Sequence, residues 1–167
     1  MLAIRAEKKS DAAAIHEVNR LAFGQVAEAN LVDLLRAKYD GLISLVAEEG
    51  GRVVGHALWS PVTIEGSSLK GMGLGPLAVL PGYQKKGIGT SLAEAGLDAC
   101  RKNGYDFALV LGHPDYYPRF GFVPASKFNL KCEYEVPDEA FMVMELRHGA
   151  LQGVSGVVRY LPEFKGV

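Results

Sequence analysis

The segment Gln84-Lys85-Lys86-Gly87-Ile88-Gly89 has the residue types of an anion-binding loop, and it stands where an amphipathic helix begins. Backbone N–H groups in the first turn of a helix have no intrahelical acceptor and carry partial positive charge. Gly87 and Gly89 let a ligand approach that backbone without meeting a Cβ atom, and Lys85 and Lys86 add two cations. These features favour a phosphate or pyrophosphate ligand, although an exposed turn that only starts the helix is the simpler alternative.

Two common nucleotide-binding loops do not fit the sequence. A Walker loop needs G-x-x-x-x-G-K-[ST], and Gly82 and Gly87 have the right separation, but Ile88-Gly89 stands where Lys-Ser/Thr is required. A Rossmann loop needs G-x-G-x-x-G between a strand and a helix, and the glycines of segment 71–75 have a different spacing. Hydrolysis of ATP or GTP and binding of NAD are therefore disfavoured.

Apolar spacings of three and four residues predict two helices near the N-terminus. The first follows the N-cap candidates Ser10 and Asp11, and the second spans Glu28–Lys38. Their predicted inner residues are Ile15, Val18 and Ala22 in the first helix and Leu31, Leu34 and Leu35 in the second. Strand patterns cover Leu2–Ala6, Leu42–Glu49, Arg52–Ile64 and Leu69–Val79. Short turns such as Gly50-Gly51 join the last three, so they must be antiparallel.

The second half of the chain predicts a crossover and further strands. A helix is expected from about Gly87 to Asn103, with Ile88, Leu92, Ala95 and Ala99 inside, and Phe107–Leu111 is typical of a buried strand. Strand, helix and strand imply one parallel pair. Closing strands are predicted at Phe122–Pro124 and Phe141–Leu146, and Val154, Val157 and Val158 suggest an edge strand. We expect one α/β (α+β) domain, 1–167, whose mixed, mostly antiparallel sheet of about 6–7 strands is flanked by helices, with 151–167 as a weakly patterned extension.

The amino-acid composition limits the classes of protein to which the chain can belong. The chain has 167 residues, 49% of them apolar, and its 20 glycines follow no fixed period, which argues against collagen and wholesale disorder. A formal net charge of −1 gives no overall field that attracts nucleic acid. Cys100 and Cys132 have no zinc-ligand spacing and are expected in the core. The charged N-terminus and the lack of about 18 consecutive apolar residues argue against a signal peptide or membrane helix and favour a cytoplasmic protein.

The Q-x-x-G-x-G pattern at 84–89 resembles the acetyl-CoA loop of the GNAT N-acetyltransferase superfamily. It follows a strand that ends Leu77-Ala78-Val79-Leu80-Pro81 and precedes a helix, as in that family. A second family pattern, Y-x-x-x-G-F, is matched by Tyr117-x-x-x-Gly121-Phe122. The resemblance covers about residues 2–147, and segment 111–122 is similar to a bacterial subgroup of predicted acetyltransferases without a settled substrate.

This resemblance implies acetyl-CoA as cosubstrate, and the sequence itself shows no metal site. The backbone of Leu77, Ala78 and Val79 would pair with the pantetheine arm where the fourth strand splays from the fifth, and one of these N–H groups would polarise the thioester carbonyl. The pyrophosphate would be held by the N–H groups of seven consecutive residues: Gln84, Lys85, Lys86, Gly87, Ile88, Gly89 and Thr90. His16, His56 and His148 are isolated in the sequence and are interpreted as structural.

The implied reaction is direct attack of a primary amine on the thioester within a ternary complex. Tyr117 matches the position of the family's general acid, because a phenol with a pKa of about 10 is protonated at pH 7 and can donate to the CoA thiolate. Its alternative role is aromatic packing. Strand 71–79 contains no carboxylate, so His113 is the candidate base. Asp115, a plain turn role for both residues, and a water molecule remain alternatives.

The acceptor is expected to be a small-molecule amine or a protein amine. Glu28 and Asn30 begin the second helix, which in this fold borders the acceptor site, and either could bind the ammonium; a helix start also favours an acid for structural reasons. Neither nucleic acid nor membrane is an expected partner, and a homodimer is left open. The alternative function is a non-catalytic acyl-CoA-binding sensor or scaffold, which would keep the phosphate loop without the chemistry.

Overall fold

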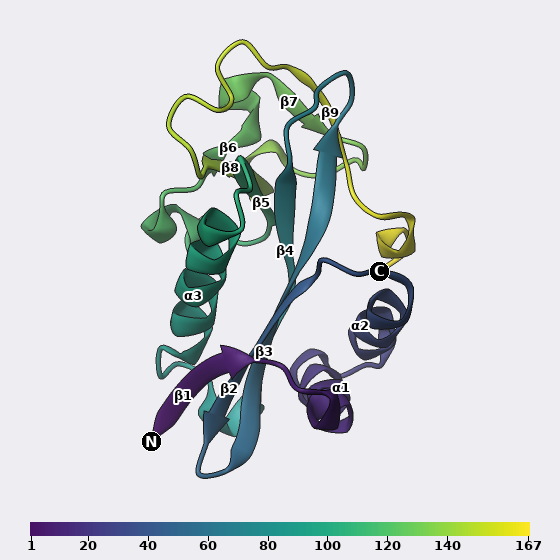
Figure 1. Cartoon of the computed structure of the whole chain (residues 1–167), viewed down its shortest axis with the longest axis vertical. Coiled ribbons are helices and arrows are strands. Elements are labelled where there is room, and N and C mark those ends of the chain that lie inside the picture. The colour runs from purple at the N-terminus through teal and green to yellow at the C-terminus, as the bar shows by residue number, and fades with distance from the viewer. The chain divides into compact units, whose positions relative to one another are not determined.

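Three α-helices and nine strands follow one another along the chain in the computed structural model, which describes all 167 residues (Figure 1). The first half contains β1 (Leu2–Ala6), α1 (Ala12–Phe23), α2 (Ala27–Lys38), β2 (Ile43–Glu49), β3 (Arg52–Ile64) and β4 (Gly71–Val79). The second half contains α3 (Ile88–Lys102), β5 (Phe107–Leu111), β6 (Val123–Pro124), β7 (Leu130–Cys132), β8 (Phe141–Glu145) and β9 (Gly156–Arg159). None of the helices combines the length and the apolar character that crossing a bilayer requires.

The hydrogen-bonded strand order is β1-β2-β3-β4-β5-β8-β6. Strand β4 runs parallel to β5, with Gly71 opposite Phe107 and Leu74 opposite Val110, and α3 connects them. The pairs β1/β2, β2/β3, β5/β8 and β6/β8 are antiparallel. The mixed, mostly antiparallel sheet with one strand-helix-strand crossover is therefore confirmed. Off this seven-strand path, β9 pairs with both β3 and β7, which brings the sheet to nine strands.

Two compact units make up the chain. The first contains Met1–Trp59, Pro76–Gly96 and Pro162–Val167, and the second contains Ser60–Gly75 and Leu97–Leu161. Strands β3 and β4 and helix α3 each continue from one unit into the other. The expectation of a single domain over 1–167 stays a prediction.

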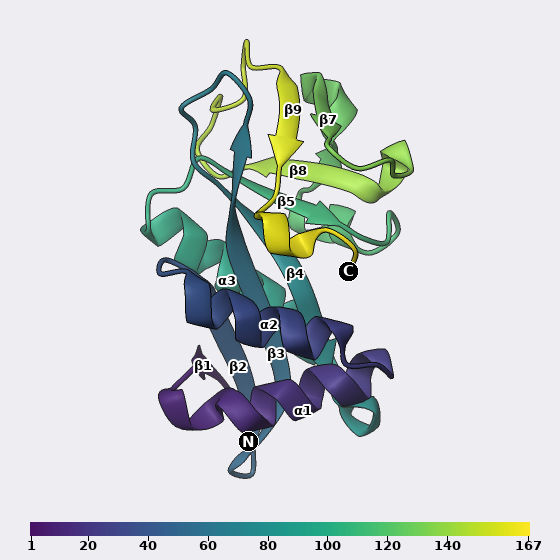
Figure 2. The same ribbon diagram turned by 90° about the vertical axis from the view of Figure 1, so that its right-hand side faces the viewer.

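In the first unit, consecutive residues of β3 face different helices. A Cβ atom on Gly55 would lie 3.0 Å from Leu92 Cδ1 of α3, whereas the His56 ring lies 3.2 Å from the Asn19 amide of α1. Side chains alternate between the two faces of a strand, so α1 and α3 cover opposite faces here. Figure 2 shows α1 and α2 side by side.

The helix faces are mostly those that the apolar spacing predicts. Ile15 and Val18 of α1 are buried, as are Leu31 and Leu35 of α2, but Leu34 is 45% exposed, and its predicted burial was wrong. Each residue turns an α-helix by about 100°, so spacing alone leaves the centre of a buried face uncertain by one position. The buried face of α2 is displaced toward Val32, which turns Leu34 to solvent.

Two further local expectations need correction. The Asp11 side chain does not cap α1; its carboxylate accepts hydrogen bonds from Arg5 at 2.7 and 3.1 Å and from the Lys8 N–H at 2.6 Å. Ala95 and Ala99, expected on the inner face of α3, are only half-buried. The helix is buried at Gly96 instead, where an added Cβ would lie 1.9 Å from Trp59 Nε1. The indole occupies the space that a side chain would need.

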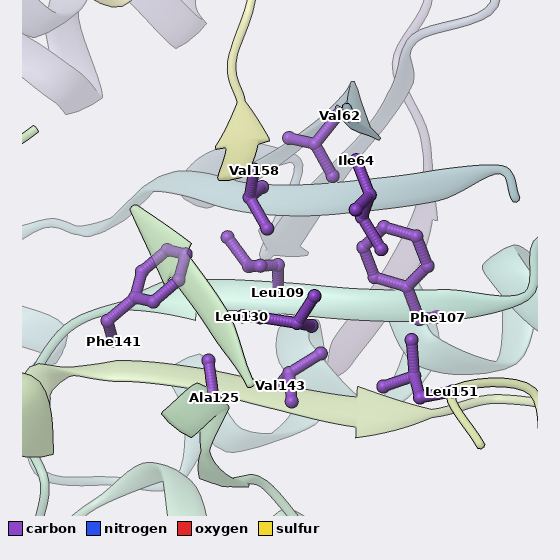
Figure 3. Close-up of a cluster of buried hydrophobic side chains, with 10 residues drawn as sticks. All are labelled: Val62, Ile64, Phe107, Leu109, Ala125, Leu130, Phe141, Val143, Leu151 and Val158. Carbon is purple, nitrogen blue, oxygen red and sulfur yellow. The ribbon is translucent and has the colours of Figure 1, made fainter. Parts of the chain in front are cut away.

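Strands from distant parts of the sequence form the apolar core of the second unit (Figure 3). Its ten buried residues are Val62, Ile64, Phe107, Leu109, Ala125, Leu130, Phe141, Val143, Leu151 and Val158. Val158 belongs to β9, and Leu130 belongs to β7, a strand that the sequence did not predict. The C-terminal extension therefore supplies core residues, and β9 lies between β3 and β7 rather than at an edge.

A buried polar network ties the helices of the first unit to its strands. His56 is fully buried; Asn19 lies 3.2 Å from its Nδ1, and the Ser44 hydroxyl lies 2.9 Å from its Nε2. Ser44 also donates to the carboxylate of Glu7, which accepts two hydrogen bonds from Arg36 of α2. The Asn19 amide nitrogen can only donate, so Nδ1 of His56 is the acceptor. The proton of neutral His56 therefore sits on Nε2. The expected structural role of His56 is thus explained.

We predict that His56 makes the folded state less stable at acidic pH. Burial lowers the pKa of His56 to about 4 from an ordinary value of 6.5, so between these values the unfolded chain binds a proton that the folded chain does not. The stabilisation is complete above pH 6.5 and is lost as the pH falls toward 4, by up to about 3 kcal/mol. Denaturant titrations at several pH values should show this loss in the natural chain and a smaller loss in His56→Gln. Equal pH slopes in the two proteins would contradict the assignment.

Candidate functional site

The loop before α3 combines left-handed backbone conformations with exposure. Lys85 has φ +63° and Gly87 has φ +83°, with a residue of negative φ between them. Alternation of left- and right-handed residues is the pattern of backbone nests, whose N–H groups bind anions. A lysine in the left-handed region is uncommon and carries backbone strain. Such strain is found chiefly at active sites and ligand-binding segments. The glycines here are visible in the sequence, whereas the left-handed conformation of Lys85 has no sequence signal.

The N–H groups of this loop are open. The first helical hydrogen bond of α3 runs from the Ser91 N–H to the Gly87 carbonyl, at 3.0 Å, so the N–H groups of residues 84–89 have no helical acceptor. Residues 84–87 are exposed, and a Cβ built on Gly87 would meet nothing within 4 Å. Lys86 extends its ammonium over the Tyr83 ring, 5.8 Å from the centroid, and Lys85 is also exposed. The loop therefore presents open donors and two cations at the positive end of a helix.

Two side chains hold the loop in place. The Gln84 amide donates a 3.0 Å hydrogen bond to the Val79 carbonyl, which ties the loop to the end of β4. Ile88 is only 4% exposed, and its Cγ2 would lie 3.2 Å from a Cβ on Gly55 of β3. Gln84 and Ile88 can therefore offer a ligand their N–H groups, while their side chains fix the backbone. Gly89 and Thr90 follow in the first turn of α3, both half-buried.

The pairing of β4 with β5 stops before β4 ends. The last paired residues are Leu74 and Val110, whereas β4 continues to Val79. Gly75 follows with φ +155°, a conformation that other residues rarely adopt, and Pro76 cannot donate to a ladder. The backbone of the predicted pantetheine-binding segment Leu77-Ala78-Val79 thus has no partner in β5.

Tyr117 is a buried phenol at the start of a short 3-10 helix, Tyr117–Phe120. The residue is 9% exposed, and its ring meets the rings of Tyr116 and Phe122 edge-on, with centroids 5.0 and 6.0 Å apart. Burial raises the pKa of Tyr117 to about 12, and neighbouring Tyr116 adds to the rise. The phenol therefore stays protonated throughout the neutral range, as a proton donor must.

The neighbouring Tyr116 is held differently. The Arg119 guanidinium lies over the Tyr116 ring, 4.1 Å from its centroid, and its Nε donates to the Tyr116 carbonyl at 2.8 Å. Gly121 ends the helix with φ +108°, and its N–H donates to the Pro118 carbonyl. This turn sets the register that gives Tyr117, and not Tyr116, the buried position.

His113 and Asp115 lie in an exposed turn. The His113 carbonyl accepts hydrogen bonds from the Tyr116 and Tyr117 N–H groups, at 3.1 and 3.4 Å. The backbone of His113 thus has a structural task, and its imidazole is open to solvent. The role of His113 as a base stays a prediction.

Glu28 and Asn30 lie in the first turn of α2. The Glu28 carboxylate accepts hydrogen bonds from the Gln25 amide at 3.0 and 3.2 Å, which closes the turn before the helix. Asn30 is exposed, and its N–H donates to the Val26 carbonyl. The structural role of Glu28 is evident, and binding of an acceptor by either residue stays a prediction.

The remaining candidates from the sequence are metal ligands and the two cysteines. No three His, Cys, Asp or Glu side chains gather closely enough to hold a metal ion. Both cysteines are free thiols; Cys100 is buried as expected, which raises the pKa of its thiol to about 12, whereas Cys132 is half-buried. The anion loop, Leu77-Ala78-Val79 and Glu28 belong to the first unit, and Tyr117 and His113 belong to the second.

Comparison with known proteins decides the family. Residues 3–125 match the model of the acetyltransferase (GNAT) domain, well over half of the chain. The chain belongs to the GNAT acetyltransferase family. This GNAT protein is 38% identical over 164 residues to the uncharacterized N-acetyltransferase YhbS of Escherichia coli K12, covering 96% of this chain and 97% of YhbS. It is 41% identical over 137 residues to the uncharacterized N-acetyltransferase YjhQ of the same strain, covering 78% and 75%.

Two solved GNAT structures share its fold and contain a coenzyme. The crystal structure of E. coli YhbS in complex with CoA superposes with a TM-score of 0.92 at 38% identity, covering 98% of this chain and 91% of that one. A GNAT acetyltransferase from Brucella melitensis in complex with acetyl-CoA gives a TM-score of 0.82 at 36% identity, covering 98% of both chains. The GNAT resemblance expected from the loop and the Y-x-x-x-G-F pattern is thereby confirmed.

One residue of this GNAT protein's site has no sequence signal of its own. Gly112 lies directly after β5, and a Cβ there would stand 2.5 Å from Tyr117 Cε2. Nothing in the spacing of the two residues indicates this contact, since it depends on how the chain turns between 112 and 117. The Y-x-x-x-G-F pattern therefore indicates Tyr117 but not Gly112.

Proposed function

We propose that this GNAT protein is an N-acetyltransferase that moves the acetyl group of acetyl-CoA to a primary amine. The observation that carries the proposal is the open, left-handed loop at the start of α3. It occurs in a chain that is 36–38% identical, over nearly its whole length, to proteins with CoA or acetyl-CoA bound. Its exposed N–H groups and two lysines match the charge and hydrogen-bonding needs of a pyrophosphate.

Acetyl-CoA binding would divide between the loop and the end of β4. The N–H groups of 84–90 would hold the pyrophosphate, with Lys85 and Lys86 adding charge. The backbone of Leu77, Ala78 and Val79 would pair with the pantetheine arm, since it has no partner in β5. One N–H of this segment would donate to the thioester oxygen as that oxygen gains negative charge.

Tyr117 would act as the general acid. In the transfer, the amine nitrogen forms a bond to the acetyl carbon, and the carbon–sulfur bond breaks. Tyr117 gives its phenolic proton to the departing thiolate and regains one from solvent. A pKa of about 12 keeps the phenol protonated at neutral pH, so its proton is present when the thiolate leaves.

The second proton of the reaction leaves the attacking amine. His113 is the candidate base, because its side chain is exposed and a neutral imidazole has a ring nitrogen that can accept a proton. Asp115 or a water molecule could take the same proton. Glu28 and Asn30 would bind the ammonium of the acceptor, a small-molecule or protein amine.

The decisive experiment combines acetyl-CoA binding with thiol release. We expect calorimetry to show micromolar binding of acetyl-CoA and no comparable binding of ATP or NAD. We expect a thiol reagent to detect free CoA with at least one amine of a broad panel of small and peptidic amines. Failure to bind acetyl-CoA would refute the proposal. Binding without thiol release from any amine would favour a non-catalytic acyl-CoA sensor, a function that the absence of a carboxylate from β4 makes worth testing.

We predict that Gly87→Val weakens acetyl-CoA binding by tenfold or more. At φ +83° a branched side chain is strained and would project into the open space above the loop N–H groups. Gly82→Ala is the matched control, because Gly82 also has open space around it but an ordinary φ. Calorimetry should separate the two variants, and thermal melts should show both folded. Equal affinities would mean that the loop does not bind the pyrophosphate.

We predict that Tyr117→Phe lowers kcat by roughly a hundredfold, the usual contribution of a general acid, with little change in the KM for acetyl-CoA. The phenylalanine keeps the packing with Tyr116 and Phe122 and removes only the hydroxyl. Steady-state kinetics with the best amine of the panel would measure the effect. Unchanged kcat would remove Tyr117 from the mechanism.

A further inference from the structure

Gly112 and the Tyr117 ring are in closer contact than any side chain at position 112 would allow. A Cβ atom on Gly112 would lie 2.5 Å from Tyr117 Cε2, 3.1 Å from Cδ2 and 3.4 Å from Cζ. The nearest of these is far inside van der Waals contact, and the three atoms form one edge of the ring. The phenol therefore lies directly against the backbone at the end of β5.

The backbone at Gly112 does not itself require glycine. Gly112 is not among the glycines with positive φ, so alanine could adopt the same conformation without strain. The three heavy atoms nearest to a Cβ at this position all belong to the Tyr117 ring, which therefore excludes a side chain there. Glycine at this position is explained by the contact with the Tyr117 ring and not by the backbone conformation.

Both sides of the contact are fixed. The Gly112 N–H donates a 2.9 Å hydrogen bond to the Ala140 carbonyl, which continues the pairing of β5 with β8. On the ring's side, Tyr116 and Phe122 meet Tyr117 edge-on. A methyl group added at 112 could be accommodated only if the Tyr117 ring moved, because the strand backbone is held by its partner.

We propose that Gly112 is a positioning residue for the general acid: its missing side chain sets where the Tyr117 hydroxyl lies, and the edge-on Tyr116 ring keeps it there. The proposal rests on the proposed acid role of Tyr117. Misplacement of a catalytic group by about 1 Å can cost a hundredfold in rate, so a residue without any functional group can still govern kcat.

The test is a double-mutant cycle on kcat, with the best amine of the panel as acceptor. We expect Gly112→Ala to lower kcat roughly tenfold or more while the KM for acetyl-CoA stays within about twofold. In the Tyr117→Phe background the same alanine should have no further effect on kcat, because the hydroxyl that it displaces is already gone.

Gly71→Ala is the matched control. A Cβ on Gly71 would lie 2.2 Å from Phe107 Cζ, so this alanine also presses on a buried aromatic ring, but on one without a proposed chemical role. It should lower the melting temperature, and any effect on kcat should be the same with and without the Tyr117 hydroxyl.

The outcomes distinguish failure of the positioning role of Gly112 from failure of the proposed acid role of Tyr117. If Gly112→Ala lowers kcat equally in both backgrounds, it acts by general damage and the positioning role is refuted. If Tyr117→Phe lowers kcat but Gly112→Ala does not, the positioning role fails and the acid role stands. If Tyr117→Phe has no effect, the acid assignment fails and the positioning role falls with it.

A spectroscopic readout needs neither acceptor nor turnover. With tyrosine labelled at Cζ, the Tyr117 resonance is identified by its loss in Tyr117→Phe. In the natural chain it should titrate near pH 12. In Gly112→Ala the ring is displaced from its buried place, so the resonance should shift and titrate closer to 10, and Gly71→Ala should leave both unchanged. An identical resonance and titration in Gly112→Ala would overturn the proposal.

If Gly112→Ala does not fold, Tyr116→Leu tests the same idea without adding atoms beneath the ring. It removes the edge-on contact, and we expect it to lower kcat only when the Tyr117 hydroxyl is present. Tyr116→Phe, which keeps the ring, should restore kcat. Loss of activity in Tyr116→Phe as well, or an equal loss in both backgrounds, would contradict a positioning role.

Discussion

The open N–H groups at the start of α3 are the constraint on which the candidate site depends. An unpaired donor in a folded protein must face solvent or a ligand, so the chain has to keep this turn both exposed and fixed. Left-handed Lys85 and Gly87 shape the turn, the Gln84 amide ties it to β4, and buried Ile88 anchors it against β3. Left-handed backbone and two side chains thus hold the candidate anion loop in one conformation.

The first unit has a second kind of restraint, which is polar and buried. The hydrogen bonds from Asn19 through His56 and Ser44 to Glu7 and Arg36 join two helices to two strands. Burial of Glu7 alone would raise its pKa, but the hydrogen bonds from Arg36 and Ser44 lower it below the ordinary value. Such a network restrains the relative placement of its elements, because loss of one partner would leave a further buried polar group without a hydrogen bond.

In the second unit, close packing restrains the Tyr117 ring, the candidate general acid. The Tyr117 ring occupies space that a Cβ atom at Gly112 would need, and neighbouring rings meet it edge-on. Burial raises the pKa of the phenol to about 12, so the group carries its proton at neutral pH. The same packing therefore would serve both the position of the hydroxyl and its protonation state.

The sequence alone determined the element order, the strand-helix-strand crossover and the GNAT family, and it marked loop 84–89 as the candidate phosphate site, because periodicity, turn residues and short motifs are local properties. Only the tertiary structure decided which neighbour each side chain meets. It turned Leu34 outward, set Gly96 against Trp59, made β9 part of a core, and brought Gly112 beneath Tyr117. These outcomes depend on how separate elements pack, and spacing along one element carries no information about its partners.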